Sequence, residues 1–256
     1  MKRAFVILLA ALFLLPACTK GFRTEKLSLE EEIPFREGSE NKLEIQLDID
    51  FPVSGYDRNV LENLRRNIRI QTLGEEYADF KGSLGELAAD YRTALLNDYR
   101  QSSEELLKDL GIPEEECYSL NWGSYINGSF GENWGDWGVY NIEHYLYLGG
   151  AHGTNSTTPM VFDTKTGQAV TWDQVAINVS NEKIVRLINK HKYDWLKDMI
   201  DENDIREEDI FYVDPIEPSE SFSVNDEGLT FYYQPYDVAP YVFGVIEIMI
   251  PWEDLR

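Results

Sequence analysis

The chain has 256 residues, enough for one large domain or two small ones. Hydrophobic residues make up 43% of the chain and aromatic residues 13%, which excludes a globally disordered protein. The 46 acidic residues outnumber the 23 basic ones, and the formal charge of −23 excludes binding to nucleic acid through a basic surface. Such an acidic surface attracts cationic partners and also keeps a protein soluble.

The first residues, MKRAFVILLAALFLLPAC, have the pattern of an export signal. Lys2 and Arg3 precede an apolar run that is too short for an ordinary spanning helix and typical of a signal peptide. The run ends in LPAC, which resembles the lipobox of bacterial lipoproteins. The resemblance implies that residues 1–17 are removed and that Cys18 is lipidated, whereas a plain secretory signal is the alternative. Loss of the two basic residues takes the formal charge from −23 to −25.

Residues 18–40 are charged and lack sustained periodicity, so we expect a tether between the lipid and the folded part. Order is expected to begin at KLEIQLDIDFPV, residues 42–53, where apolar and polar residues alternate as in a half-buried strand. We expect Pro52 to end this strand. Apolar residues at helical spacing then predict helices over 58–74 and 83–110, the second stopped by Gly111 and Pro113.

The second half of the chain is predicted to be richer in strands. Two strand-like stretches, 118–130 and 139–150, flank the turn segment GENWGDWG and predict a hairpin, and residues 158–175 predict another that turns at TKTG. A helix is expected over 181–200, with Ser180 as its N-cap. Short strands on both sides of NDEG and a last strand in FGVIEIMIPW follow. This order of elements predicts an α+β fold, an antiparallel sheet with helices packed on it.

The histidines are the first candidates for catalysis. His152 lies in GGAHG, where the glycines permit close backbone approach, and it is either a polar ligand contact or a side chain bonded across a tight turn. His144 and His191 are expected to be packing residues, because the spacing of the three histidines matches no zinc signature. No nucleophile elbow or phosphate loop is present, so we expect no catalytic residue, no metal and no cofactor. Cys117 is expected to be a buried apolar residue, because its acidic neighbours disfavour a thiolate.

Aromatic residues supply the candidates for ligand binding. Trp134 and Trp137 lie in the turn segment and either stack on sugar rings or pack on the second helix. The stretch YYQPYDVAPY, residues 232–241, supplies Tyr236, Asp237 and Tyr241. Pro235 is expected to end strand pairing and to place these three residues in a stiff loop, which loses little entropy when it binds.

Three stretches together resemble a known family: YLGGAHGTN at 147–155, FDTKTGQAVTWDQV at 162–175, and the segment 228–255. Their order and spacing are similar to the DUF3298 domain, which occurs in a lysozyme-sensing anti-sigma factor and in some peptidoglycan deacetylases. Residues 45–68 resemble the companion DUF4163 segment. We therefore divide the chain into a signal peptide (1–17), a tether (18–40), a DUF4163-like segment (41–115) and a DUF3298-like domain (116–256).

The resemblance implies a binding module and not an enzyme. The expected function is recognition of a cell-wall-related ligand, either a basic protein such as lysozyme or peptidoglycan, by a protein anchored in the cell envelope and periplasmic or surface-exposed. Two alternatives remain open: an envelope hydrolase that uses His152, and a structural partner within an envelope complex.

Overall fold

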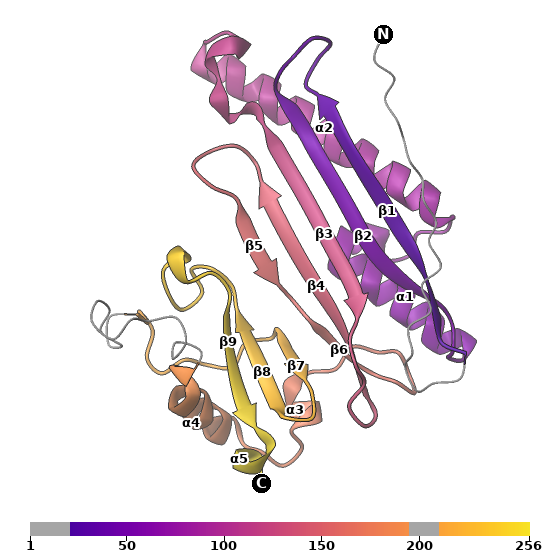
Figure 1. Cartoon of the computed structure of the whole chain (residues 1–256), viewed down its shortest axis with the longest axis vertical. Coiled ribbons are helices and arrows are strands. Elements are labelled where there is room, and N and C mark those ends of the chain that lie inside the picture. The colour runs from indigo at the N-terminus through magenta and orange to yellow at the C-terminus, as the bar shows by residue number, and fades with distance from the viewer. Residues whose placement is uncertain (1–20, 195–209) are drawn as a thin grey trace. The chain divides into compact units, whose positions relative to one another are not determined.

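The computed structural model describes residues 21–194 and 210–256 (Figure 1). The predicted signal peptide, Cys18 and the last residues of the helix expected over 181–200 lie outside the described residues. The chain divides into two compact units, which do not follow the predicted boundary at 115/116. The first unit holds the residues up to 129 together with 144–154, and the second holds 130–143 and 155–256. Strand β4 contributes to both.

The first unit contains a sheet with two long helices on one face (Figure 1). Its strands lie in the order β1, β2, β3, followed by the end of β4. The bounds of these elements are β1 Arg23–Pro34, β2 Lys42–Ser54, α1 Arg58–Leu73, α2 Leu84–Leu110, β3 Trp122–Phe130 and β4 Trp137–Tyr147. Both predicted helices are confirmed, and Ser83 and Glu86 form a capping box at the start of α2.

Strand β1 shows that the predicted tether is wrong over residues 23–34. It pairs antiparallel with β2 along its length, with Leu27 opposite Ile49 and Ile33 opposite Leu43. The alternation of apolar and polar residues in β1 was not recognised in the sequence, because Glu31 occupies an inward position of the strand. Its carboxylate pairs with the Arg92 guanidinium of α2, at 2.7 Å for the Nη2 contact, so the charge is compensated there.

Strand β2 does not end at Pro52 but continues to Ser54. Its ladder with β3 covers only Leu43 to Ile49, so the proline lies beyond that ladder and costs it no hydrogen bond. The β2–β3 pairing is parallel, whereas β1–β2 is antiparallel. The inward residues of β2 are buried against helix residues such as Leu64 and Ile68, while its outward residues are mostly charged.

The second unit has shorter elements. The first part of β4 pairs antiparallel with β6, and β7, β8 and β9 form a separate antiparallel sheet. The bounds are β5 Thr154–Thr157, β6 Met160–Asp163, α3 Trp172–Val175, α4 Asn181–His191, β7 Phe222–Val224, β8 Gly228–Tyr233, β9 Ile246–Pro251 and α5 Trp252–Leu255. The chain turns at TKTG as predicted, but its returning arm keeps only a bridge at Ala169 before α3 begins.

Alternate residues of β8 and β9 build the core of the second unit. Phe231 and Tyr233 are buried and Tyr232 is half-buried, as the alternation predicts, and Ile184 and Ile188 of α4 join the same cluster. The Ser180 hydroxyl accepts from the Lys183 N–H, which confirms the predicted N-cap. The α+β fold with mainly antiparallel sheets is thus confirmed. Within 21–194 and 210–256, no helix combines the length and apolar character that crossing a membrane requires.

Candidate functional site

The loop after β8 presents Tyr236 in an unusual backbone conformation. Its φ is +76°, in the left-handed region that residues other than glycine rarely adopt, and 59% of its surface is exposed. The rings of Tyr236 and Tyr241 lie 5.6 Å apart at 31°. Beside them Val242 is 79% exposed. A strained backbone that presents an exposed aromatic ring is a common feature of binding sites.

Hydrogen bonds fix this loop from two sides. The Tyr212 hydroxyl lies 2.6 Å from the carbonyl oxygen of Tyr236 and 2.8 Å from that of Ala239, and its single proton is shared between these two acceptors. The Asp237 carboxylate accepts from the Gln234 N–H at 2.7 Å, so this predicted ligand contact serves the loop itself. The Gln234 amide in turn bonds the N–H and the carbonyl of Thr157, at 2.9 and 2.8 Å. The loop is therefore held in one conformation before any partner arrives.

A hollow of about 420 Å³ adjoins the tyrosines. It is lined by Asn155, Pro235, Tyr241, Val242 and Gly244. Its walls are mostly apolar, with the Asn155 amide as a polar group. Together with the ring of Tyr236, these residues form a surface that we call the tyrosine loop (residues 234–244, with Tyr212 and Asn155). Tyr212 and Val242 were missed in the sequence. Tyr212 lies outside the three resembling stretches and only the folded chain brings it to the loop, and Val242 was not singled out within the segment 228–255.

The predicted tryptophans Trp134 and Trp137 are half-buried and pack against the core of the second unit. The Trp134 ring stacks on Trp252 at 4.2 Å between centroids and 8° between planes. In the first unit, the ring of Trp122 lies 5.5 Å from that of Tyr99 of α2. The face of Trp134 against Trp252 is already occupied by a ring, so it does not offer that face to a sugar.

His152 lies in the first unit and is exposed. Its Nδ1 is 3.2 Å from the carbonyl oxygen of Gly153 in the same turn. The glycines beside it do permit close approach: a Cβ at Gly153 would lie 2.5 Å from the Tyr145 ring, and one at Gly149 would lie 2.1 Å from the Ser119 carbonyl oxygen. His152 belongs to the first unit, whereas the tyrosine loop belongs to the second.

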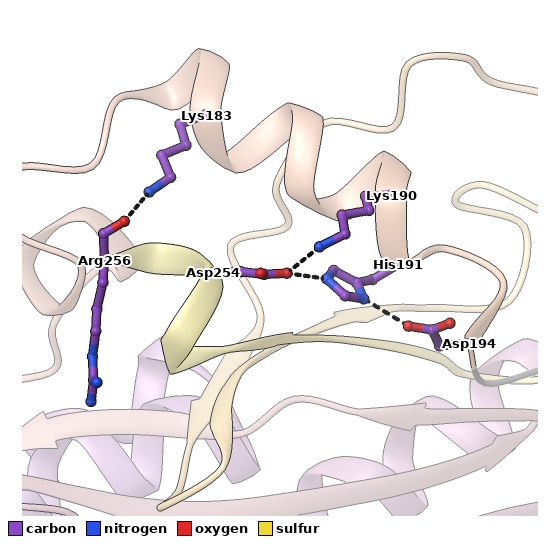
Figure 2. Close-up of polar contacts among 6 residues, drawn as sticks. All are labelled: Lys183, Lys190, His191, Asp194, Asp254 and Arg256. Carbon is purple, nitrogen blue, oxygen red and sulfur yellow. Dashed lines mark hydrogen bonds and ion pairs between the residues drawn. The ribbon is translucent and has the colours of Figure 1, made fainter.

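The remaining histidines differ from each other. Burial lowers the pKa of His144, whose Nε2 is buried without a hydrogen-bond partner among the described residues. His191 ends α4 and contacts two carboxylates, those of Asp194 and Asp254 (Figure 2). Cys117 is buried, as predicted. Across 21–194 and 210–256, no group of three or more His, Cys, Asp or Glu side chains is arranged to hold a metal ion.

Comparisons with known proteins identify the C-terminal part of the chain. Residues 175–253 match the family model DUF3298, a protein family of unknown function, and no curated protein matches the chain. A solved DUF3298 family structure from Bacteroides fragilis aligns with a TM-score of 0.76 and 21% identity, covering 95% of this chain and 92% of that one.

A DUF3298 family protein from Pseudomonas aeruginosa aligns with a TM-score of 0.63 and 18% identity, covering 91% of each chain. At these identities the likeness concerns the fold. Tyr212 and residues 234–244 of the tyrosine loop lie within the matched residues, whereas Asn155 lies outside them. The resemblance of 45–68 to DUF4163 stays a prediction. Residues 175–253 therefore match the DUF3298 family model, and the fold of the chain is similar to that of solved members of this family.

Proposed function

We propose that the protein is a lipid-anchored binding module of the cell envelope, which recognises a cell-wall-related ligand through the tyrosine loop. A basic protein of the lysozyme type is the favoured ligand, and peptidoglycan is the second. The observation that carries the proposal is the exposed ring of Tyr236 on a fixed loop. The Tyr212 hydroxyl holds this loop through the carbonyl oxygens of Tyr236 and Ala239. The lipid anchor rests on the LPAC sequence that ends at Cys18.

The loop suits a protein ligand for two physical reasons. Tyrosine gives a large contact area with few rotatable bonds, and a loop that is already fixed loses little entropy on binding. The formal charge of −25 after signal removal speeds the approach of a basic protein, while the buried contact of a tyrosine slows its departure. Charge therefore governs the association rate, and the tyrosine loop governs the lifetime of the complex.

The test is binding of the chain from residue 19 onward, which retains every described element, to a panel of lysozymes and to purified peptidoglycan. We expect Tyr236→Ala to weaken binding about thirtyfold, because a central aromatic anchor is typically worth about 2 kcal/mol. Tyr236→Phe keeps the ring and is the matched control, with binding close to that of the unchanged chain. Higher salt is expected to slow association more than it speeds dissociation.

Three outcomes contradict parts of the proposal. Absence of binding to every lysozyme and to peptidoglycan removes the proposed ligands. Binding that Tyr236→Ala leaves unchanged removes the tyrosine loop as the site. Hydrolysis of peptidoglycan that is lost in His152→Ala supports the envelope hydrolase instead.

A further inference from the structure

His191 places each of its ring nitrogens against a carboxylate (Figure 2). Nε2 lies 2.7 Å from Asp254 Oδ2 of α5, and Nδ1 lies 2.7 Å from Asp194 Oδ2. The side chain of His191 is only 12% exposed, whereas those of Asp194 and Asp254 are 48% and 25% exposed. The ring thus connects the residues just after α4 with α5.

Counting protons determines the charge of this ring. A neutral imidazole has one N–H donor and one nitrogen with a lone pair, whereas an imidazolium has two donors. Ionised carboxylates only accept hydrogen bonds. Both contacts of His191 are therefore favourable only when the ring carries its second proton. The neutral ring serves one carboxylate and turns a lone pair toward the other.

Among the residues that the structure describes, the charged groups bonded to the ring or to its partners are these two carboxylates and one ammonium. Lys190 Nζ lies 2.6 Å from the same Asp254 oxygen, and Lys190 and His191 hold the pKa of Asp254 below its usual range. Lys183, nearer the start of α4, donates to the main-chain carbonyl of Arg256 at 3.0 Å. Strand β9, which contacts α4, contributes the buried residues Ile246, Ile248 and Ile250, so that side of α4 faces apolar groups.

Both ends of this connection are bound to further parts of the second unit. On the α5 side, Trp252 Nε1 donates to the Asn225 carbonyl at 2.8 Å in the β7–β8 turn, and its ring stacks on Trp134. On the α4 side, Lys192 pairs with Asp214 at 2.9 Å, and the rings of Tyr193 and Phe211 lie 5.6 Å apart. A change at His191 is thus positioned to loosen α5 relative to α4.

We propose that His191 is a proton-dependent latch, which fastens α5 to the end of α4 when its imidazole is doubly protonated and weakens that attachment when the ring is neutral. Only the doubly protonated ring can donate to the carboxylates of both Asp194 and Asp254. The attachment therefore weakens when the ring loses its second proton as the pH rises.

The latch is also limited at low pH, by protonation of Asp254. The pKa of Asp254 is lowered, so its contribution is present above the ordinary aspartate range and is lost only when the pH falls through its lowered value. The latch thus requires an ionised Asp254 together with a doubly protonated His191 ring. This device is independent of the proposed ligand, since it concerns only contacts within the second unit.

The experiment compares the unfolding equilibrium of the full chain with that of His191→Gln at pH 5.5 and pH 8.5. Between these two pH values, we expect the unfolding equilibrium constant of the unchanged chain to rise by a factor about five times that of the variant. The difference is modest because the contact that is lost is partly exposed. His144 and His152 are present in both chains, so their titration cancels. Asp194→Asn is the second variant, and it is expected to reduce the pH dependence in the same direction.

Nitrogen NMR of the unchanged chain, labelled at histidine, tests the same proposal without any variant. We expect the His191 ring to show two protonated nitrogens at pH 5.5 and one at pH 8.5, with the signals of α5 changing over the same pH range. Equal pH dependence in the unchanged chain and His191→Gln overturns the proposal. So does a ring with a single protonated nitrogen at pH 5.5, or α5 signals that stay constant while the ring titrates.

Discussion

Two pairs of tyrosines, one in each unit, show how the same residue type takes different tasks. In the first unit Tyr125 and Tyr145 stack at 5.3 Å and 18°, and the Tyr125 hydroxyl donates to Glu44 at 2.5 Å. In the second unit Tyr236 and Tyr241 are tilted at 31°, and Tyr236 is exposed on a backbone of positive φ. The first pair is built into the surface of a sheet, whereas the second projects from a loop.

The difference comes from the backbone beneath each pair. Tyr125 and Tyr145 belong to strands, and the glycines beside them, Gly123 and Gly153, leave room for the flat rings. Tyr236 follows a proline, outside any strand, and its carbonyl accepts a hydrogen bond from Tyr212. A tyrosine becomes a candidate for binding through exposure and a fixed backbone, and composition alone does not distinguish the two pairs.

The largest effect is expected from Gly149→Ala, in the turn that follows β4. The new Cβ would lie 2.1 Å from the Ser119 carbonyl oxygen, and the φ of +80° is unfavourable for alanine. We expect a loss of about 3 kcal/mol in the free energy of unfolding, from overpacking and backbone strain together. Denaturant unfolding measures it, with Gly150→Ala as control, since that site has a φ of +108° but open space for the Cβ.

The control separates clash from strain. If both alanine variants lose the same amount, strain alone accounts for the cost and the close approach at Ser119 is unimportant. A larger loss in Gly149→Ala than in Gly150→Ala shows that the first unit depends on the close approach of Gly149 to the Ser119 backbone. Binding through the tyrosine loop is expected to survive in the folded fraction of either variant.

The sequence predicted the regular elements better than the sites. Helices α1 and α2 and strands β8 and β9 follow from apolar periodicity, because burial of one face requires that pattern. Strand β1 was missed because Glu31 stands at an inward position, and only its pairing with Arg92 permits this. No local pattern could reveal that partner, which lies 61 residues away.

The candidate site was predicted in part. Tyr236 and Tyr241 were identified from their stiff, tyrosine-rich segment, and the structure brings their rings together. The positive φ of Tyr236 and the role of Tyr212 could not be predicted, since they depend on contacts across 24 and 27 residues of chain. The contact of His191 with Asp254 was missed for the same reason, because Asp254 lies 63 residues further along the chain.

A smaller effect tests whether Tyr236 is held under strain. Tyr236→Ala and Tyr236→Gly both remove the ring, but only glycine adopts a φ of +76° without cost. We expect the glycine variant to be more stable than the alanine variant by about 1 kcal/mol, measured by denaturant unfolding. Equal stability of the two would indicate that the loop relaxes in solution, and it would weaken the contrast with the strand-bound pair.

The smallest effect concerns the hydroxyl of the first pair. Lys42 and Tyr125 hydrogen-bond Glu44 and hold the pKa of this carboxyl below its usual range, with Lys42 as the larger cause. Tyr125→Phe removes one donor and keeps the ring, so we expect the pKa of Glu44 to rise toward the ordinary value while the stack on Tyr145 remains. Carboxyl NMR titration measures this shift.

The sign of the stability change follows from the direction of that shift. A carboxyl whose pKa is lowered in the folded chain adds stability above its ordinary pKa and loses it as the pH falls through the lowered value. Tyr125→Phe should therefore reduce stability slightly at neutral pH and leave it unchanged in strong acid, where Glu44 is protonated in both chains. Because the pair is partly exposed, the loss at neutral pH is expected to be below about 1 kcal/mol. Ligand binding that changes with Tyr125→Phe would place the first tyrosine pair in the site and break the distinction between the two units.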